Sequence, residues 1–458
     1  TISGDLTRNI PETIESSGGP ITQDNTGAEF YANIFAIAES EIEEGVIWTG
    51  SDDGLIYVTR NGGKNWENVT PPENISPKLN MINSIDISPF KKGKVYIAAT
   101  SYKFGDYTPY IYKTEDYGKT WNLITNGINK DYYTRVVRTD KKREGLLYAG
   151  TEWGMFISFD DGTSWKHFQL NLPITSIRDL EVKDNDLVVA THGRSFWMID
   201  DLTPLHQLNN DMKSNSAILY KPDISYRLAQ SGGWRKPNTL LVGENHPNGV
   251  IINYYLKNYN ENDFVKIDIL NKDGSTIRSY TNNKNKLEEY SNKPVLSNEN
   301  DIDYALSASN IKNIKPKPGG NKLIWDMRHP GFVAFDGMVL YSSPNTGPKV
   351  VPGKYDVVLT YNEVELKKEF EIVKDPRVSN TQEDYENQLE FLLQVRNEVS
   401  KANQTIIDIR KIKKDLKYLK SKVSDKNQIV DLIDNFNKQL EVVENKIHMT
   451  KNQSRQDP

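Results

Sequence analysis

The chain has 458 residues, and 57 Lys and Arg against 62 Asp and Glu give it a formal net charge of −5. This acidic balance excludes a broadly basic nucleic-acid binder, because phosphate binding needs a positive face. The chain has no cysteine, which excludes disulfides, thiolate metal sites and cysteine nucleophiles and is typical of bacterial envelope or extracellular proteins. At about 150 residues per domain, the length predicts roughly three domains.

The first 208 residues contain an internal repeat that begins near residue 30. In each copy, an alternating strand is followed by an apolar strand that ends in a small residue and then Ser or Thr. The small residues are Gly50, Ala99, Gly150 and Ala190, at spacings of 49, 51 and 40. The preceding strands are expected at 34–39, 82–88, 135–140 and 177–183. This period is typical of one four-stranded blade of a β-propeller.

Three of the repeats carry a second motif, Ser/Thr-x-Asp-x-Gly-x-Thr-Trp, known as the Asp-box or BNR repeat. It predicts a hairpin whose side chains bond backbone N–H groups while glycine supplies a positive φ. The Trp is expected to be buried between neighbouring sheets in all three copies. The defining positions are Asn61 and Trp66, Asp116 and Trp121, and Asp160 and Trp165. Turn chemistry explains these residues, so they are poor catalytic candidates.

The corners between second and third strands carry different polar or aromatic residues in each repeat. In a propeller these corners share one face with the loops that enter each blade, so we expect one ligand face there. Its candidate residues are Asp52, Asp53, Tyr102, Glu152, Trp153, His192 and Arg194. A glycosidase needs two carboxylates about 5 to 10 Å apart, and Asp53 and Glu152 are the candidates for that pair. The competing interpretation is that Asp52 and Asp53 form a tight turn and that His192 and Arg194 fasten the last blade.

Beyond residue 208 the pattern changes twice. Residues 209–248 are irregular and predict a linker that packs along the propeller, whereas 249–375 alternate at period two and predict a small immunoglobulin-like β-sandwich. Within it, 281–312 are expected to form an extended insertion. Residues 376–458 carry apolar heptads broken near 424–428 and predict an antiparallel helical hairpin with coiled-coil packing.

The order of these motifs resembles bacterial proteins labelled BNR-repeat glycosyl hydrolases or sortilin-like propellers, across nearly the whole chain. The matching stretches are Gly45 to Gly54, Asp186 to Trp197, Trp325 to Arg328 and Asp375 to Arg377. The resemblance implies a secreted, periplasmic or cell-surface bacterial protein with a propeller, an immunoglobulin-like domain and a helical tail. Members are usually longer at both ends, which implies further blades upstream. Asp-boxes occur in hydrolases and in non-enzymatic receptors alike, so the motif does not decide catalysis.

Other chemistries lack their motifs. The six His residues show no metal-ligand spacing, no calcium loop of the Asp-x-Asp-x-Asp type occurs, and no phosphate-binding glycine loop follows a strand, so we expect neither metal nor cofactor. The Lys-rich stretch 411–426 fits a solvated helix face better than a nucleic-acid site. No apolar run approaches the roughly 18 residues of a membrane-spanning helix.

Two functions therefore compete. The first is an extracytoplasmic propeller scaffold that binds a protein or a glycan on the corner face, held in an envelope complex by its sandwich and helical tail. The alternative is a glycoside hydrolase that acts on a polysaccharide. An enzyme requires a cleft with two facing carboxylates, whereas a scaffold requires a broad patch on its surface.

Overall fold

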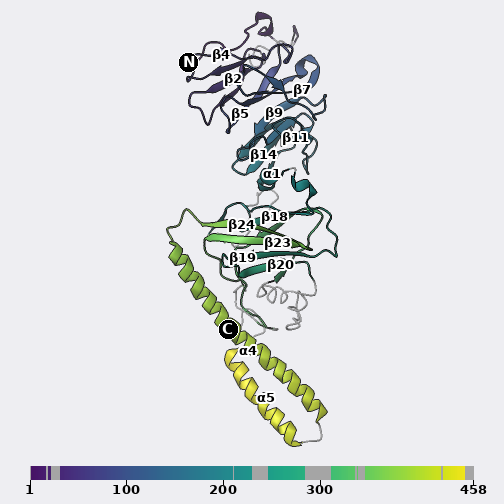
Figure 1. Ribbon diagram of the computed structural model, residues 1–458, viewed down its shortest axis with the longest axis vertical. Coiled ribbons are helices and arrows are strands. Elements are labelled where there is room, and N and C mark those ends of the chain that lie inside the picture. Colours follow the sequence, from purple (N-terminus) through teal and green to yellow (C-terminus); the bar gives the residue numbers. More distant parts are fainter. Residues whose placement is uncertain are drawn as a thin grey trace. The chain divides into compact units, whose positions relative to one another are not determined.

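The computed structural model describes residues 2–16, 19–21, 31–209, 211–228, 246–283, 311–335, 338, 346–423 and 427–448. It is mainly β with a helical C-terminal part and has two compact units, Thr1–His206 and Gln207–Pro458 (Figure 1). Three predicted features lie largely outside the described residues: the insertion at 281–312, the helix break near 424–428 and the later part of the linker, 229–245.

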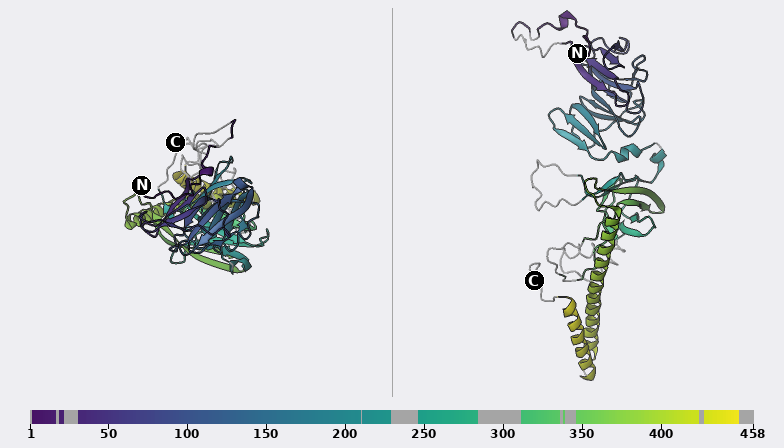
Figure 2. Two further views of the ribbon diagram at one scale, coloured as in Figure 1. Left: turned by 90° about the horizontal axis from the view of Figure 1, so that it is seen from above. Right: turned by 90° about the vertical axis from the view of Figure 1, so that its left-hand side faces the viewer.

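The first unit consists of antiparallel sheets that follow one another along the chain, each an up-and-down meander (Figures 1 and 2). The first three sheets have four strands and the last has three. Their strands are β1 Ile34–Glu39, β2 Ile47–Ser51, β3 Ile56–Thr59 and β4 Glu67–Asn68; β5 Met81–Ile87, β6 Val95–Ser101, β7 Asp106–Thr114 and β8 Asn122–Leu123; β9 Thr134–Thr139, β10 Leu147–Thr151, β11 Gly154–Ser158 and β12 Lys166–His167; β13 Ile177–Lys183, β14 Asp186–Thr191 and β15 Phe196–Ile199. The predicted first strands of the first and fourth repeats match β1 and β13 residue for residue, and the other two are displaced by one residue.

Each sheet packs against the next through an apolar layer, and the small residue of each second strand makes this packing possible. A Cβ on Gly50 would lie 2.2 Å from the side chain of Ile82, at the start of the next sheet. A Cβ on Gly150 would lie 2.7 Å from that of Ile177 in the same way. The small residues that marked the repeat are therefore the points where the next sheet crosses closely.

The three Asp-box turns have the same hydrogen bonds. The hydroxyls of Thr59, Thr114 and Ser158 each accept a bond of 2.9 Å from the glycine N–H four residues on. Asp116 Oδ1 accepts from the hydroxyl of Thr114 and from the N–H of Thr120, both at 2.9 Å. Side chains thus satisfy the turn backbone, as the motif predicts.

The Trp of each turn reaches back to the preceding segment, and here the three copies differ. Trp121 and Trp165 are 7% and 4% exposed, and their indole N–H groups donate to Val69 O and Ile124 O of the preceding sheet. Trp66 donates to Ile2 O at 2.9 Å and is only half-buried. The expectation of three equivalent buried Trp residues is wrong for Trp66, because a short N-terminal segment takes the place that a whole sheet takes at the others.

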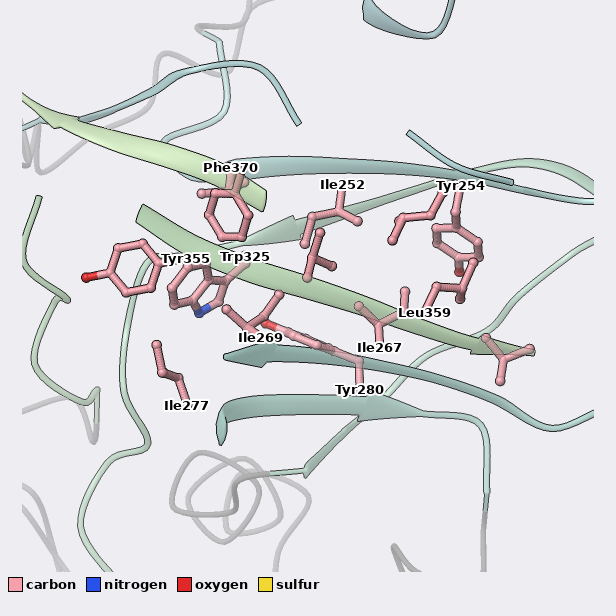
Figure 3. Close-up of a cluster of buried hydrophobic side chains, with 14 of the residues drawn as sticks. Ile252, Tyr254, Ile267, Ile269, Ile277, Tyr280, Trp325, Tyr355, Leu359 and Phe370 are labelled. Atoms are coloured by element: carbon pink, nitrogen blue, oxygen red, sulfur yellow. The ribbon is translucent and has the colours of Figure 1, made fainter. Parts of the chain in front are cut away.

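The second unit contains two sheets around one core. One has the order β16-β18-β22 and the other β17-β24-β23-β19-β20-β21, with parallel pairing only at its two edges, between β17 and β24 and between β20 and β21. Their bounds are β16 Ala217–Leu219, β17 Ser225–Arg227, β18 Val250–Leu256, β19 Val265–Leu270, β20 Thr276–Thr281, β21 Ile311–Asn313, β22 Gly319–Trp325, β23 Gly353–Tyr361 and β24 Val364–Lys374. Figure 3 shows the core, in which Trp325 packs against Tyr355 and Phe370 with ring centroids about 6 Å apart. The immunoglobulin-like topology stays a prediction.

The segment predicted as a linker contributes to these sheets. It supplies β16 and β17, which pair with β18 and β24. Two three-residue strands are too short to show a period in the sequence. The short helices are η1 Pro11–Thr13, which precedes the first strand, and η2 Tyr102–Phe104, α1 Thr203–Gln207 and η3 Asp211–Ser214, which lie between strands.

Two long helices end the described chain, α4 Gln382–Lys422 and α5 Asn427–Ile447, and they lie side by side (Figures 1 and 2). Thr381 and Asp384 form a capping box that starts α4. Ion pairs from Arg410 to Glu444 at 2.8 Å and from Lys420 to Asp434 at 2.6 Å show that the helices are antiparallel. The middle of α4 also binds the chain before it, since Ser400 Oγ accepts a bond from Val333 N.

Candidate functional site

The third strand of each sheet runs from a corner to the opposite end, so corners and Asp-box turns lie at different ends of the sheets. Asn61, Asp116 and Asp160 each accept a hydrogen bond from the backbone N–H four residues on, within their own turns. At the corner end, side chains of all four sheets and their entering loops make a series of contacts. We name this series the corner strip, and its members are Tyr31, Tyr102, Phe104, Tyr107, Tyr133, Arg135, Glu152, Trp153, Ser176, Arg178 and His192.

The centre of the corner strip is an arginine that lies beside two stacked tyrosines. Tyr102 and Tyr133 stack with centroids 5.0 Å apart, and the Arg135 guanidinium carbon lies 4.7 Å from the first ring centroid and 4.8 Å from the second. These distances are within cation–π range. Tyr102 comes from the corner of the second sheet, whereas Tyr133 and Arg135 come from the start of the third.

Glu152 neutralises this arginine. Its Oε2 accepts bonds from Arg135 Nη2 at 2.9 Å, Arg135 Nε at 3.1 Å and Ser176 Oγ at 2.7 Å. Burial raises the pKa of Glu152, but the bonds from Ser176 and Arg135 outweigh it and hold the pKa below its usual value. Glu152 is therefore an ionised, anchored carboxylate that ties the third corner to the loop entering the fourth sheet.

Three aromatic rings of the corner strip are largely exposed. Phe104 is 56% exposed, Tyr107 52% and Trp153 50%. Phe104 stacks on Tyr31 at 6.4 Å, Tyr107 lies 5.9 Å from Tyr133, and Trp153 lies 6.5 Å from Tyr132. The rings thus rest on other aromatic groups and present their outer surface to solvent, which is the chemistry of residues that anchor a ligand.

Asp52 and Asp53 lie at the same end but point inward. They are 7% and 1% exposed. Asp52 accepts bonds from the N–H and the side-chain amide of Asn33, and Asp53 accepts from Ser51 Oγ at 2.5 Å and from Arg8 N at 2.7 Å. This is the arrangement of a turn that also fastens the N-terminal segment.

The fourth corner places His192 and Arg194 on the surface. His192 Nδ1 lies 3.1 Å from Arg178 Nη2, and its backbone N–H donates to Ser176 O at 2.9 Å, which joins it to the rest of the strip. The side chain of Arg194 is exposed, while its backbone carbonyl accepts a bond from the indole of Trp197. The charge partner of Glu152 is Arg135, from the first strand of the same sheet.

Sequence reasoning missed the residues that come from the entering loops and first strands, namely Tyr31, Tyr133, Arg135, Ser176 and Arg178. Their signal was available, because loops that enter a blade share the face of the corners. A single sequence does not show which of these residues bind Glu152, because Arg135 and Ser176 belong to two different sheets.

Within the described ranges, no group of three or more His, Asp and Glu side chains is placed to hold a metal ion. None of the helices that the structure describes is both long and apolar enough to cross a membrane.

No family model matches the chain, and no curated protein sequence matches it. Similar solved structures include "YCF48 bound to D1 peptide", at 21% identity and TM-score 0.27 over 34% of this chain and 47% of that one. YCF48 from Cyanidioschyzon merolae has 16% identity and TM-score 0.29 over 37% and 53%, so the chain spans about half the length of both. The GH74 xyloglucanase from Xanthomonas campestris has 11% identity and TM-score 0.29 over 49% and 35%.

Proposed function

We propose that the sheets of the first unit are blades of a β-propeller and that the corner strip is a non-catalytic binding surface for a segment of another protein. The observation that carries this proposal is the strip itself. It combines three half-exposed aromatic rings with arginine, histidine and carboxylate groups, held by contacts that cross all four sheets. Trp, Tyr and Arg are the side chains that most often anchor protein ligands.

Phe104 favours a protein segment over a glycan as the ligand. Its ring has no polar atom and is more than half exposed. It lies beside Tyr31, and the Nζ of Lys103 lies 5.1 Å from the centroid of the Tyr31 ring. An apolar side chain gains most from covering such a ring, and the ring offers no hydrogen-bonding atom that would orient the hydroxyl groups of a sugar. Glycan binding is accordingly an outcome of the test below.

Exposed apolar groups on the first and last sheets support the prediction that these blades belong to a larger ring. Phe35 and Ile37 on β1 are 55% and 66% exposed, and Phe196 and Met198 on β15 are 77% and 58% exposed. In a closed propeller such faces pack against further sheets. An extracytoplasmic, bacterial location remains an expectation from the sequence resemblance.

The alternative, a glycoside hydrolase with Asp53 and Glu152 as its carboxylate pair, has less support. A general acid needs a raised pKa, but that of Glu152 is lowered. Asp53 is 1% exposed and already bonded to Ser51 and Arg8. A substrate would not reach Asp53 without breaking these bonds.

The proposal is tested by selecting binders to the full chain from a displayed random peptide library and from a glycan array. We expect a peptide whose dissociation constant rises at least tenfold, about 1.4 kcal/mol, in Trp153→Ala and Tyr107→Ala. Phe90→Ala is the matched control, because Phe90 is 39% exposed and lies between β5 and β6, at the other end of the second sheet.

Peptides that bind Trp153→Ala as tightly as the unchanged chain would contradict the assigned surface. Glycans that bind in place of peptides, with the same sensitivity to Trp153, would replace the protein ligand with a sugar. Release of sugar from a polysaccharide that is abolished in Glu152→Gln would establish the hydrolase instead.

A further inference from the structure

The first strands of the third and fourth sheets carry an arginine at the same point, Arg135 in β9 and Arg178 in β13. In each strand, the residues before and after the arginine pair with two consecutive residues of the neighbouring second strand. Gly150 and Ala190, the small residues of the repeat, are the partners of the residue that follows the arginine. Each arginine is therefore the extra residue of a β-bulge, a position that changes the direction of a side chain.

The corner residues beside the two arginines are equivalent as well. The backbone N–H of Glu152 donates to Tyr133 O at 3.1 Å, and that of His192 donates to Ser176 O at 2.9 Å. Each acceptor lies two residues before the arginine of its own sheet. Glu152 and His192 thus occupy the same place in the third and fourth sheets.

The two arginines direct the same nitrogen atoms at these corner residues. Nε and Nη2 of Arg135 donate to Glu152 Oε2 at 3.1 and 2.9 Å. Nε and Nη2 of Arg178 lie 3.2 and 3.1 Å from His192 Nδ1. The fourth sheet therefore repeats the geometry of the Arg135–Glu152 ion pair with an imidazole nitrogen in place of the carboxylate. Because an imidazole carries no negative charge, it does not neutralise Arg178.

No other carboxylate of the described residues lies within ion-pair distance of Arg178. Asp179, the next residue, binds Arg138 Nη2 at 2.8 Å. The side chain of Arg135 is only 11% exposed, whereas Arg178 is an exposed residue. Arg194, two residues after His192, is also exposed. The fourth corner is thus a positively charged part of the corner strip that a ligand can reach.

We propose that Arg178 binds a carboxylate of the protein segment on the corner strip, in the role that Glu152 has for Arg135. This inference rests on the proposed function and adds the chemistry of the partner, which is an acidic segment. Both hydrogens of Arg178 Nη1 and the second hydrogen of Nη2 are donors that a carboxylate can accept from. Arg194 adds a second positive charge at the same corner, which favours an acidic partner over a neutral one.

The first test uses synthetic peptides copied from those that the displayed library yields, with the full chain as their partner in fluorescence anisotropy. We expect the peptides to contain Asp, Glu or a free C-terminus. Changing the peptide carboxylate to its amide should raise the dissociation constant at least tenfold for the unchanged chain but less than twofold for Arg178→Gln. Arg60→Gln is the matched control, because the Arg60 side chain is 52% exposed in an Asp-box turn, at the other end of the first sheet.

A second variant supplies the missing carboxylate from within the chain. His192→Glu places an acid at the position that Glu152 has in the third sheet, so it should compete with the peptide for Arg178. We expect the dissociation constant of the acidic peptide to rise at least tenfold more in His192→Glu than in His192→Gln, which removes the same imidazole without adding charge. Equal losses in both variants would overturn the proposal, because the charge at this position would then not matter.

The source of the carboxylate is decided by the same peptides. Each is made with a free and with an amidated C-terminus, and each acidic side chain is changed singly to its amide. A loss on amidation of the terminus would identify a C-terminal carboxylate as the group that Arg178 binds. A loss at one side chain alone would identify an internal Asp or Glu. Either result supports the proposal.

The outcomes separate this inference from the proposed function. Peptides that need Trp153 but bind Arg178→Gln as tightly as the unchanged chain would overturn the carboxylate site and leave the corner strip as the binding surface. Peptides that bind without any need for Trp153, or no peptide binding at all, would overturn the proposed function and this inference with it. Circular dichroism checks that each variant keeps the fold of the unchanged chain.

Discussion

The two ends of the sheets in the first unit repeat at the same spacing but differ in chemistry. The Asp-box turns hold nearly the same residues each time and make the same bonds: hydroxyl to glycine N–H, and Asp or Asn to the backbone four residues on. The corners hold different residues with different partners, and Arg135 and Glu152 occur at one corner only. Residues that repeat with identical bonds, as in the turns, stabilise the fold. Residues that vary on a shared face, as at the corners, are the ones we expect to bind a ligand.

The largest expected effect separates the turns from one another. Trp121→Ala and Trp165→Ala should each lower the free energy of unfolding by about 3 to 5 kcal/mol, as for other large buried aromatics. Trp66→Ala should cost less than half as much, because its ring packs on a short segment and is only half-buried. Urea denaturation measures the three values, and equal losses would show that the N-terminal segment packs as well as a full sheet.

The next largest effect on stability is expected at the third corner, where Glu152 holds Arg135. Glu152→Gln removes the charge partner of Arg135 and should cost about 1 to 3 kcal/mol at neutral pH. The folded-state pKa of Glu152 lies below its ordinary value, so this contribution is present at neutral pH and is lost as pH falls through the folded pKa. The difference between Glu152→Gln and the unchanged chain should therefore shrink on acidification in denaturation curves taken from pH 7 to pH 3. A difference independent of pH would mean that the charge of Glu152 contributes nothing.

A smaller effect compares carboxylate with amide in the turns. Asp116→Ala should cost about 1 kcal/mol, because Asp116 accepts bonds from Thr114 and from both the N–H and the hydroxyl of Thr120. Asn61→Ala should cost less, since within the described turn Asn61 Oδ1 accepts bonds from the Thr59 hydroxyl and the Asn65 N–H alone. Melting temperatures are sufficient for this comparison, and ligand binding should be unchanged in both variants.

The smallest expected effect on stability is at the exposed side chains of the corners, Trp153 and Arg194. Trp153→Ala and Arg194→Ala should stay within about 0.5 kcal/mol of the unchanged chain, as substitutions at exposed positions usually do. Denaturation curves for the two variants check this. A loss of several kcal/mol at Trp153 would place that ring among the structural residues and remove it from the proposed surface.

The sequence by itself determined where the strands and turns of the first unit lie. The small residues at Gly50 and Gly150, the Asp-box hydroxyls and the heptads of α4 and α5 are local signals, because backbone geometry and side-chain period act over a few residues. The same signals separated the mainly β part of the chain from its helices. They also placed Glu152, Trp153 and His192 at one end of the sheets.

Only the tertiary structure decided which of these side chains are free. It buried Asp53 against Arg8, paired Glu152 with Arg135 across 17 residues and left Trp66 only half-buried against Ile2. In the helical hairpin it left Phe436 and Val443 of the predicted heptads half exposed and buried Glu444 instead, with Arg410 and Lys413 as its partners. Burial and partner choice depend on residues distant in the chain that fold to the same place, and a local pattern carries no record of them.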